Sequence, residues 1–333
     1  MRRLLWACVV SLLLYGAAFG FVLDRPLSLG LPRAQLDAKL AHGAAIRGPK
    51  LVILAGSNGP YSHRCETIEP ILGMPCVNGG VAVGIGLDYL FARWQPLLHP
   101  GDVVYLPLEE AQYTVTPAAS RLGPDAAIMA RHDWTTLASL PAPRWIASLF
   151  AFDLRAAVMS AIETGLFVGG FHDPRAEAIG TTNAWGDHTG HTIVLAEASQ
   201  PVLARIDPVH ATAAQVRTQA ASEQVAAFLD WASAHGVRAI GGLPTGFADS
   251  PIPVETMAAI RSLFESHRAG FIDPPNHGRY GRREFFDTAD HLNEPAQIRH
   301  AAMIAHALRA TIAHALRATI PPVIAAAESP PRL

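Results

Sequence analysis

The sequence predicts an α/β fold, in which a parallel sheet is covered by helices on both faces to give three layers. Short runs of β-branched residues and leucine recur along the chain, and most end in turn-forming residues, as buried strands do. Amphipathic stretches separate these runs, and strands that alternate with helices pair in parallel through right-handed crossovers. Half of the residues are hydrophobic and only 16% are charged, which suits a large buried core.

The N-terminus of this 333-residue chain has the pattern of an export signal. Arg2 and Arg3 precede an apolar run from Leu4 to Leu23, with small residues near its end. A segment of about 20 residues spans a bilayer, and this run is of that length. An uncleaved anchor is therefore an alternative to a cleaved signal peptide, and a buried N-terminal helix is a third. We expect a periplasmic or secreted protein, with or without an anchor in the inner membrane.

We divide the chain into a leader at 1–23, a proline-punctuated linker at 24–49 and one domain at 50–333. The first part of this domain carries three expected strands and two helices between them. The strands are Leu51 to Ala55, Cys76 to Gly80 and Val103 to Leu106, and the helices are Glu66 to Leu72 and Leu87 to Leu98.

The alternation of expected strands and helices weakens from about 111 to 208. In this region Trp145 to Phe167 suggests apolar helices, and Asn183 to His191 suggests a polar loop. We interpret this region as a large insertion that caps a site at the carboxyl edge of the sheet, or that docks a partner or a membrane surface. The α/β pattern then resumes. Its expected elements are helices at Val209 to His235, Val254 to His267 and Pro295 to Ile320, and strands at Val237 to Leu243 and Phe271 to Asp273.

Two cysteines follow the leader, Cys65 and Cys76. An oxidising compartment would allow a disulfide between them. However, a helix of the expected length separates its two ends by about 10 Å, which exceeds the Cα reach of a disulfide unless the chain folds back. We therefore expect two buried free thiols.

Two polar clusters follow expected strands. Ser57 lies in Gly-Ser-Asn-Gly directly after the first strand, and His291 lies just ahead of the last helix, with Asp287 and Asp290 shortly before it. Ligands bind outside the carboxyl ends of strands in open α/β sheets. A serine there, with a histidine and a carboxylate, suits a nucleophile, its general base and the group that orients the base. The alternative is a turn without chemistry.

In their order and placement these pieces resemble the SGNH/GDSL hydrolase superfamily. The resemblance is closest to exported SGNH-like proteins of bacterial exopolysaccharide systems of the cellulose or alginate type. The matching pieces are Gly56-Ser57-Asn58, Asn78-Gly79-Gly80 with Gly84, the Pro-Gly-Asp-Val-Val segment of the third strand, and the block from Asp287 to Asn293. The resemblance implies a flavodoxin-like, three-layer α/β/α fold.

The same resemblance implies roles for individual residues. Ser57 would attack an ester carbonyl, His291 would take its proton, and Asp287 would orient the imidazole, with Asp290 as the alternative acid. The groups around the oxyanion would come from Asn58, Asn78 and Gly80.

The sequence departs from the family pattern in three places. Ser57 is second rather than third in its motif, and Thr288 stands three residues before His291, where the family has aspartate. The Gly-x-Asn-Asp block expected after the third strand is replaced by Leu106-Pro107-Leu108-Glu109-Glu110. Glu109 and Glu110 are compatible with glycoside chemistry, but a helix start or a solvated pair explains them more simply.

The leading hypothesis is an exported O-acyl esterase or acyltransferase that acts on a cell-envelope or secreted polysaccharide without a cofactor. Its partners would be the acylated sugar and membrane-bound acyltransferase or synthase components. The rival is a non-catalytic accessory or scaffold protein of polysaccharide synthesis and export. A net charge of -2 without a basic cluster argues against nucleic acid. We expect no metal site, because His188 and His191 with His172 and Asp173 make only a weak ligand pattern.

Overall fold

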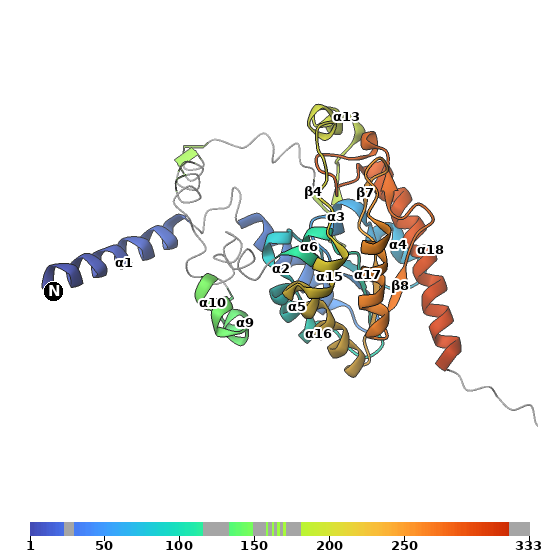
Figure 1. Cartoon of the computed structure of the whole chain (residues 1–333), viewed down its shortest axis with the longest axis horizontal. Helices are drawn as coiled ribbons and strands as arrows, with labels where there is room; N and C mark the ends of the chain where they lie inside the picture. Colours follow the sequence, from blue (N-terminus) through green and yellow to red (C-terminus); the bar gives the residue numbers. More distant parts are fainter. Residues whose placement is uncertain are drawn as a thin grey trace, which may run out of the picture.

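The computed structural model describes residues 1–22, 30–115, 133–148 and 181–319, together with six isolated residues between 158 and 170. Within these ranges the chain is a mixed α/β protein built on one five-stranded parallel sheet (Figure 1). The strand order is β2-β1-β3-β6-β8. The strands are β1 (Leu51–Ile53), β2 (Cys76–Asn78), β3 (Val103–Leu106), β6 (Arg238–Gly242) and β8 (Gly270–Ile272).

All five strands begin within a residue or two of where the sequence predicts them. Leu51 pairs with Cys76 on one side and with Val103 on the other, so β1 lies between β2 and β3. The connection after β1 runs to β2 on one side, and the next connection crosses back to β3 on the other side of β1. This reversal makes a topological switch point at the carboxyl end of β1.

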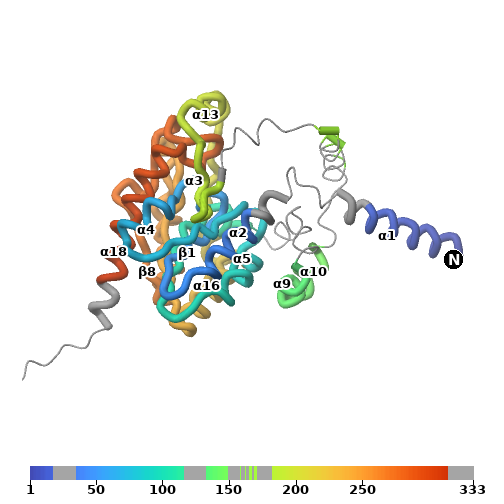
Figure 2. Tube along the Cα trace, turned by 180° about the vertical axis from the view of Figure 1, so that it is seen from behind, coloured from blue at the N-terminus to red at the C-terminus, as the bar shows by residue number. Residues whose placement is uncertain are grey.

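Each face of the sheet carries its own hydrophobic core, because alternate strand residues point to opposite faces. Val52 and Val104 pack on one face against α2 (Gly30–Ala45), α5 (Leu87–Trp94), α15 (Ala213–Thr218), α16 (Ala220–Ala234) and α17 (Val254–Ser266). Leu51 and Ile53 pack on the other face against α4 (Cys65–Leu72) and α18 (Glu294–Thr319). Figures 1 and 2 show the two sets of helices on opposite sides of the strands. This arrangement is consistent with a three-layer α/β/α fold.

The covering helices agree in part with the expected ones. Their bounds are α4 (Cys65–Leu72), α5 (Leu87–Trp94), α15 (Ala213–Thr218), α16 (Ala220–Ala234), α17 (Val254–Ser266) and α18 (Glu294–Thr319). The single helix expected over 209–235 is wrong, because the chain breaks at Gln219, which is extended (ψ 145°). A short 3-10 turn, η2 (Gln95–Leu97), replaces the end of the helix that was expected to run to Leu98.

The segment expected as a linker contains a helix, α2 (Gly30–Ala45). Its Leu36 and Leu40 are buried in the same core as β1 and β3, so the packed domain begins before residue 50. The leader forms α1 (Arg2–Val22), which lies apart from this core and exposes leucines at positions 4, 5 and 12–14 (Figure 1). Within the described residues, no helix combines the length and apolar character needed to cross a membrane.

Only parts of the expected insertion are described. They comprise α6 (Glu110–Thr114), α9 (Trp134–Ser139), α10 (Ala142–Ser148), β4 (Thr181–Thr182), β5 (His188–Thr189), α13 (Ile193–Glu197) and α14 (Gln200–Leu203). Most of the segment 145–167, where apolar helices were expected, lies outside the described residues. His172 and Asp173 of the weak metal pattern also lie outside them. The loop expected at 183–191 is a short antiparallel hairpin, since Thr182 pairs with His188.

The expectation of free thiols is wrong, because Cys65 and Cys76 form a disulfide with their Cα atoms 5.3 Å apart. The two cysteines come close together because Gly73 ends α4 in the left-handed conformation (φ 71°). This conformation, which glycine adopts without a steric penalty, turns the chain back along α4 into β2.

A buried ion pair joins the start of β1 to the start of β3. Lys50 Nζ lies 2.7 Å from Asp102 Oδ2, and both side chains are 1% exposed. Asp102 also accepts the backbone N–H groups of Lys50 and His99. The pair therefore joins β1 to its neighbour β3 at the amino ends of these strands, opposite to the switch point.

Candidate active site

Ser57 lies at a tight turn between β1 and a short helix, α3 (Asn58–Ser62). Two glycines allow this turn to pack closely. A Cβ atom on Gly59 would lie 3.0 Å from the Cα of Gly80, and one on Gly80 would lie 2.9 Å from the carbonyl oxygen of Gly56. The turn therefore presses against the loop after β2, at the carboxyl edge of the sheet.

The structure brings Ser57, His291 and Asp287 together. His291 Nε2 lies 2.8 Å from Ser57 Oγ, and His291 Nδ1 lies 2.7 Å from Asp287 Oδ1. An Nδ1–H that donates to the carboxylate leaves Nε2 free to accept the serine proton. The His291 side chain is 10% exposed, whereas the Asp287 side chain is 40% exposed. Chemically, this arrangement can deprotonate a serine hydroxyl and stabilise the resulting imidazolium.

The loop that carries His291 is fixed by α3 and by the segment after β6. The Asp290 carbonyl oxygen accepts hydrogen bonds from Ser62 Oγ at 2.7 Å and from Thr245 Oγ1 at 2.8 Å. Phe285 and Leu292 form an isolated β-bridge that closes the base of the loop. The Ser62 and Thr245 hydroxyls therefore position the histidine loop against the helix that follows Ser57.

Tyr61 is stacked between two histidines. Its ring lies 4.1 Å from that of His291 with an interplanar angle of 8°, and 4.1 Å from that of His188 at 27°. The tyrosine comes from α3 and His188 from the hairpin, so the stack joins the nucleophile turn, the histidine loop and the hairpin. Because stacked rings resist rotation about χ angles, Tyr61 restricts the orientation of the His291 imidazole.

The residues expected around the oxyanion have other hydrogen-bond partners. The Asn78 amide nitrogen lies within 3.0 Å of the carbonyl oxygens of Gly59 and His63 and of Asp187 Oδ1. The Asn58 amide donates to the carbonyl oxygen of Pro107. The side chains of Asn58 and Asn78 therefore brace the turn around Ser57.

Gly80 lies beside α3, as expected, and its carbonyl oxygen accepts a hydrogen bond from Lys39 Nζ of α2. Lys39 is 2% exposed, and burial lowers the pKa of its ammonium group to about 7. The nearby Asp187 carboxylate opposes this effect. A buried lysine of α2 thus fixes the loop after β2.

Glu109 contacts the nucleophile turn directly. Its Oε1 accepts the backbone N–H of Asn58 at 2.9 Å and lies 3.3 Å from Ser57 Oγ. The residue is 6% exposed, and burial raises the pKa of its carboxyl group. Glu109 precedes α6, as a helix start would require, but its side chain is directed into the site and not into solvent.

A polar cavity of about 150 Å³ adjoins Glu109, and its lining includes Glu110, His210, Arg279 and Asp290. Glu110 Oε1 lies 2.9 Å from His210 Nδ1, so this carboxylate has a basic partner. Burial raises the pKa of the Asp290 carboxyl group, and the neighbouring Glu109 raises it further. Asp290 therefore faces Glu109 and the cavity, while Asp287 is the acid that contacts His291.

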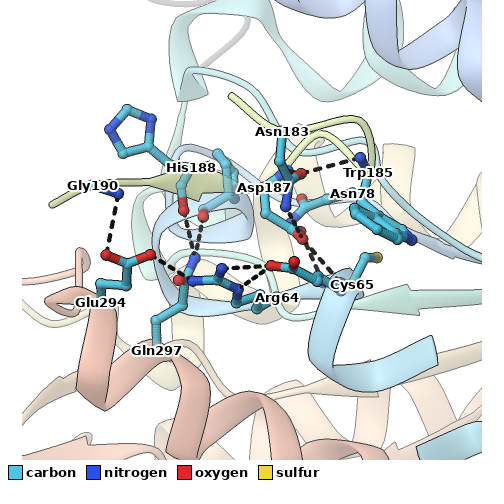
Figure 3. A network of polar contacts seen from close by, with 12 residues as sticks. Arg64, Cys65, Asn78, Asn183, Trp185, Asp187, His188, Gly190, Glu294 and Gln297 are labelled. Carbon is cyan, nitrogen blue, oxygen red and sulfur yellow. Dashed lines mark hydrogen bonds and ion pairs between the residues drawn. The ribbon is translucent and has the colours of Figure 1, made fainter. Parts of the chain in front are cut away.

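The hairpin at 181–191 is fastened to the helices beneath it by a polar network (Figure 3). Asp187 accepts the backbone N–H groups of Cys65 and Glu66 at 2.8 and 3.0 Å, which caps the N-terminus of α4. On the other side, Glu294 of α18 accepts from Arg64 and from Gly190. Gln297 of α18 completes the network by donating to the carbonyl oxygen of His188.

Further buried histidines surround α3. Burial lowers the pKa of His63 to about 4, and burial with the nearby His188 and His291 lowers that of His191 to about 3. His63 Nε2 lies 3.4 Å from His300 Nε2, and His300 Nδ1 lies 2.8 Å from the Tyr280 hydroxyl. These imidazoles are therefore neutral at pH 7. Among the described residues, no group of three or more His, Cys, Asp or Glu side chains could hold a metal ion.

No protein-family model matches this chain, and no curated protein is detectably similar to it. The site therefore has to be interpreted from its own geometry.

Sequence reasoning placed Ser57, His291 and Asp287 in one site but gave no role to Tyr61 or Lys39. It also did not anticipate the contacts that Asp187 makes with α4 or that Glu109 makes with the serine turn. Tyr61 and Glu109 carried a usable signal, because each lies within a few residues of a strand end or of the serine. The partners of Asp187 and Lys39 are distant in sequence, such as Cys65 for Asp187 and Gly80 for Lys39. No local pattern could have indicated those contacts.

Proposed function

We propose that this protein is an SGNH-like serine O-acyl esterase or acyltransferase that acts on an exported or cell-envelope polysaccharide. The observation that carries the proposal is the set of contacts among Ser57, His291 and Asp287 at the carboxyl edge of a parallel sheet. Parallel sheets place reactive groups at that edge, and this order of hydrogen bonds is what an acyl-transfer site requires. The strand order agrees with a flavodoxin-like topology.

In the proposed reaction Ser57 Oγ attacks the ester carbonyl carbon while His291 Nε2 takes the hydroxyl proton. The tetrahedral intermediate then expels the sugar oxygen, which receives that proton from His291. An acyl group remains on Ser57. Water accepts it in a hydrolase and a sugar hydroxyl accepts it in a transferase, so both activities use the same nucleophile.

The substrate class is proposed from the N-terminal pattern, the family resemblance and the polar cavity beside Glu109. The export pattern of the N-terminus and the resemblance to exopolysaccharide proteins favour an acylated glycan. The cavity beside Glu109 adds polar side chains such as Arg279 and His210, which can hydrogen-bond hydroxyl groups. Periplasmic or secreted location, and membrane-bound acyltransferase or synthase partners, belong to the same proposal.

The test is esterase activity of the full chain, kept in a mild detergent, on p-nitrophenyl acetate, with a fluorophosphonate probe for the reactive serine. Ser57→Ala should abolish labelling and turnover, and His291→Ala should reduce both by several orders of magnitude. Ser266→Ala and His277→Ala, which change exposed residues of the same types, should retain full activity. Acetylated oligosaccharides, with and without an acceptor glycan, would then separate transfer from hydrolysis.

Background rates in the parent protein together with no labelling of Ser57 would contradict the proposal. The accessory or scaffold function would then take its place. One observation favours that rival, since the Glu109 carboxyl group already occupies the N–H of Asn58 beside the serine.

A further inference from the structure

A second serine, histidine and carboxylate are in contact, and they share no residue with the Ser57 site. His210 Nε2 lies 2.9 Å from Ser250 Oγ, and His210 Nδ1 lies 2.9 Å from Glu110 Oε1. An Nδ1–H that donates to the carboxylate leaves Nε2 free to accept the serine proton. The contacts therefore follow the order of nucleophile, base and acid that an acyl-transfer site requires.

Three separate segments bring these side chains together. Glu110 is the first residue of α6, His210 lies between α14 and α15, and Ser250 lies in the turn after β7 (Gly246–Phe247). Glu110 Oε2 also accepts the backbone N–H of Ala211 at 2.9 Å. One carboxylate oxygen thus holds the segment that carries the histidine, while the other contacts the imidazole, so the orientation of the base is fixed from two sides.

The two consecutive glutamates at the start of α6 reach different serine sites. Glu109 Oε1 lies 3.3 Å from Ser57 Oγ, whereas Glu110 Oε1 contacts His210. Neighbouring side chains at a helix start point in different directions, which allows one short segment to serve both places. The glutamate pair that the sequence explains as a helix start therefore also supplies a carboxylate to each serine site.

The second site borders the polar cavity of about 150 Å³, whose lining includes Glu110, His210 and Gly246. The side chains of His210 and Glu110 are 18% and 14% exposed, and Ser250 is half-buried. None of the three is therefore sealed inside the hydrophobic core. The cavity gives room for a small acyl group beside the base.

The same cavity contains a cation that can stabilise a developing negative oxygen. Arg279 lines it, and its Nε and Nη2 atoms donate to the carbonyl oxygens of His277 and Pro244. Its Nη1 atom lies against the Cα of Gly246, in the strand that leads to Ser250, and has no acceptor among the residues that the structure describes. A guanidinium with an uncommitted N–H is a suitable partner for the oxyanion of an acyl-transfer step.

We propose that Ser250, His210 and Glu110 form a second nucleophilic site, at which Ser250 accepts a small acyl group from an ester. The inference goes beyond the proposed function and rests on residues that the Ser57 reaction does not use.

The step balances without any additional reagent. When Ser250 Oγ bonds to the ester carbonyl carbon, the carbonyl π electrons move to the carbonyl oxygen and the serine proton moves to His210 Nε2. The alcohol oxygen then leaves with the electrons of its bond to carbon and takes that proton. His210 is neutral again, and the acyl group remains on Ser250. Glu110 stabilises the imidazolium that exists between the two proton transfers.

The experiment uses the full chain in mild detergent with Ser57→Ala, so that the first serine cannot react. The protein is treated with p-nitrophenyl acetate or with a small fluorophosphonate, quenched in acid and digested, and the peptide that contains Ser250 is analysed by mass spectrometry. We expect an acetyl or phosphonyl adduct on Ser250. The exposed serines Ser262 and Ser266 are controls in the same digest and should remain unmodified.

Two further variants test the base and the acid in the same Ser57→Ala background. His210→Gln keeps a hydrogen-bonding side chain but provides no base, so the labelling rate of Ser250 should fall at least about 100-fold. Glu110→Gln removes the charge that stabilises the imidazolium and should lower the rate at least about tenfold. Near-UV circular dichroism verifies that each variant keeps its tertiary structure. If one of them fails to fold, the other decides.

The absence of an adduct on Ser250 with both reagents would overturn the inference, and His210 would then be only a tie between loops. Labelling of Ser250 at the parent rate in a folded His210→Gln or Glu110→Gln variant would also overturn it, because the hydroxyl would then react without assistance. The two serines are distinguished by repeating the labelling with Ser57 intact. An adduct on Ser57 alone rejects the second site, whereas one on Ser250 alone supports it and rejects the proposed function.

Discussion

The ring of Tyr61 lies nearly parallel to the imidazole of His291, with their centroids 4.1 Å apart. The two residues are far apart in the sequence, and the contact exists because α3 and the loop before α18 meet at the carboxyl edge of the sheet. The neutral tyrosine ring stacks on the imidazole of the proposed general base and brings no charge to it, so its contribution is geometric.

Tyr61→Ala should therefore lower kcat/KM for the proposed ester substrate by about 2- to 13-fold, since an aromatic pair contributes about 0.5–1.5 kcal/mol. Tyr61→Phe keeps the stacked ring and should stay within about twofold of the parent. Steady-state kinetics on both variants, with near-UV circular dichroism to verify folding, would check this. Equal losses in the two variants would contradict a stacking role.

The two aspartates of the histidine loop should differ sharply in their effects. Asp287 lies 2.7 Å from His291 Nδ1, so Asp287→Asn removes the charge that orients and stabilises the imidazolium. We expect a loss of about 100-fold or more in kcat at the pH of maximal activity, and less than about tenfold for Asp290→Asn. Kinetics at that pH would decide; a larger loss for Asp290→Asn would assign the orienting role to the other acid.

Part of the candidate site could be predicted from the sequence. The strand before Ser57 and the loop that carries His291 were predicted from neighbouring residues, and the alternation of strands and helices placed both residues at the same edge of the sheet. The parallel pairing of the strands followed from the same alternation, whereas their order in the sheet did not. The short runs of β-branched residues also located all five strands, because burial on both faces leaves little freedom in composition.

What the sequence could not predict depended on tertiary contacts. The disulfide required the chain reversal at Gly73, and the expected oxyanion role of Asn78 did not anticipate that its amide is committed to the backbone of α3. The contact of Glu109 with the serine turn depends on the absence of a side chain at Gly56 and on the backbone N–H of Asn58, which donates to its carboxyl group. None of these conditions is visible within a local window of sequence.

The disulfide should contribute substantially to stability. It closes a loop with a sequence separation of 11 residues between Cys65 and Cys76, for which loop-closure entropy suggests about 3 kcal/mol. Replacing both cysteines by alanine should lower the free energy of unfolding by about that amount in urea titrations. Cys8→Ala, which changes an exposed free thiol, is the control and should have no effect. Identical midpoints for the parent with and without a reductant would refute the expectation.

Lys39 should make stability depend on pH. Its folded-state pKa of about 7 lies below the ordinary lysine value of 10.5, so between those values the unfolded chain holds a proton that the folded chain has lost. Stability therefore rises with pH across this window, by up to about 1.4 kcal/mol per pH unit. Lys39→Met lacks this contribution. The difference in unfolding free energy, parent minus variant, should increase from pH 7 to 9.5, and parallel curves would contradict the prediction.

The Lys50–Asp102 pair should affect stability but not the site. Lys50→Met leaves a buried carboxylate without its cation and should cost about 3–5 kcal/mol in urea unfolding. Lys50→Met with Asp102→Asn removes both charges and keeps an oxygen for one of the two backbone N–H donors, so part of this loss should be recovered. A loss below about 1 kcal/mol in the single variant would show that the charge is compensated elsewhere.

The contact between Gly56 and Glu109 has an evolutionary consequence. Because the carboxyl group of Glu109 lies against the Cα of Gly56, any larger residue at position 56 requires a shorter or displaced side chain at position 109. The two positions should therefore covary when homologous sequences are gathered. A glycine before the serine, paired with a glutamate some fifty residues later, gives a two-site signature with which to search genomes for relatives that a single short motif would not retrieve.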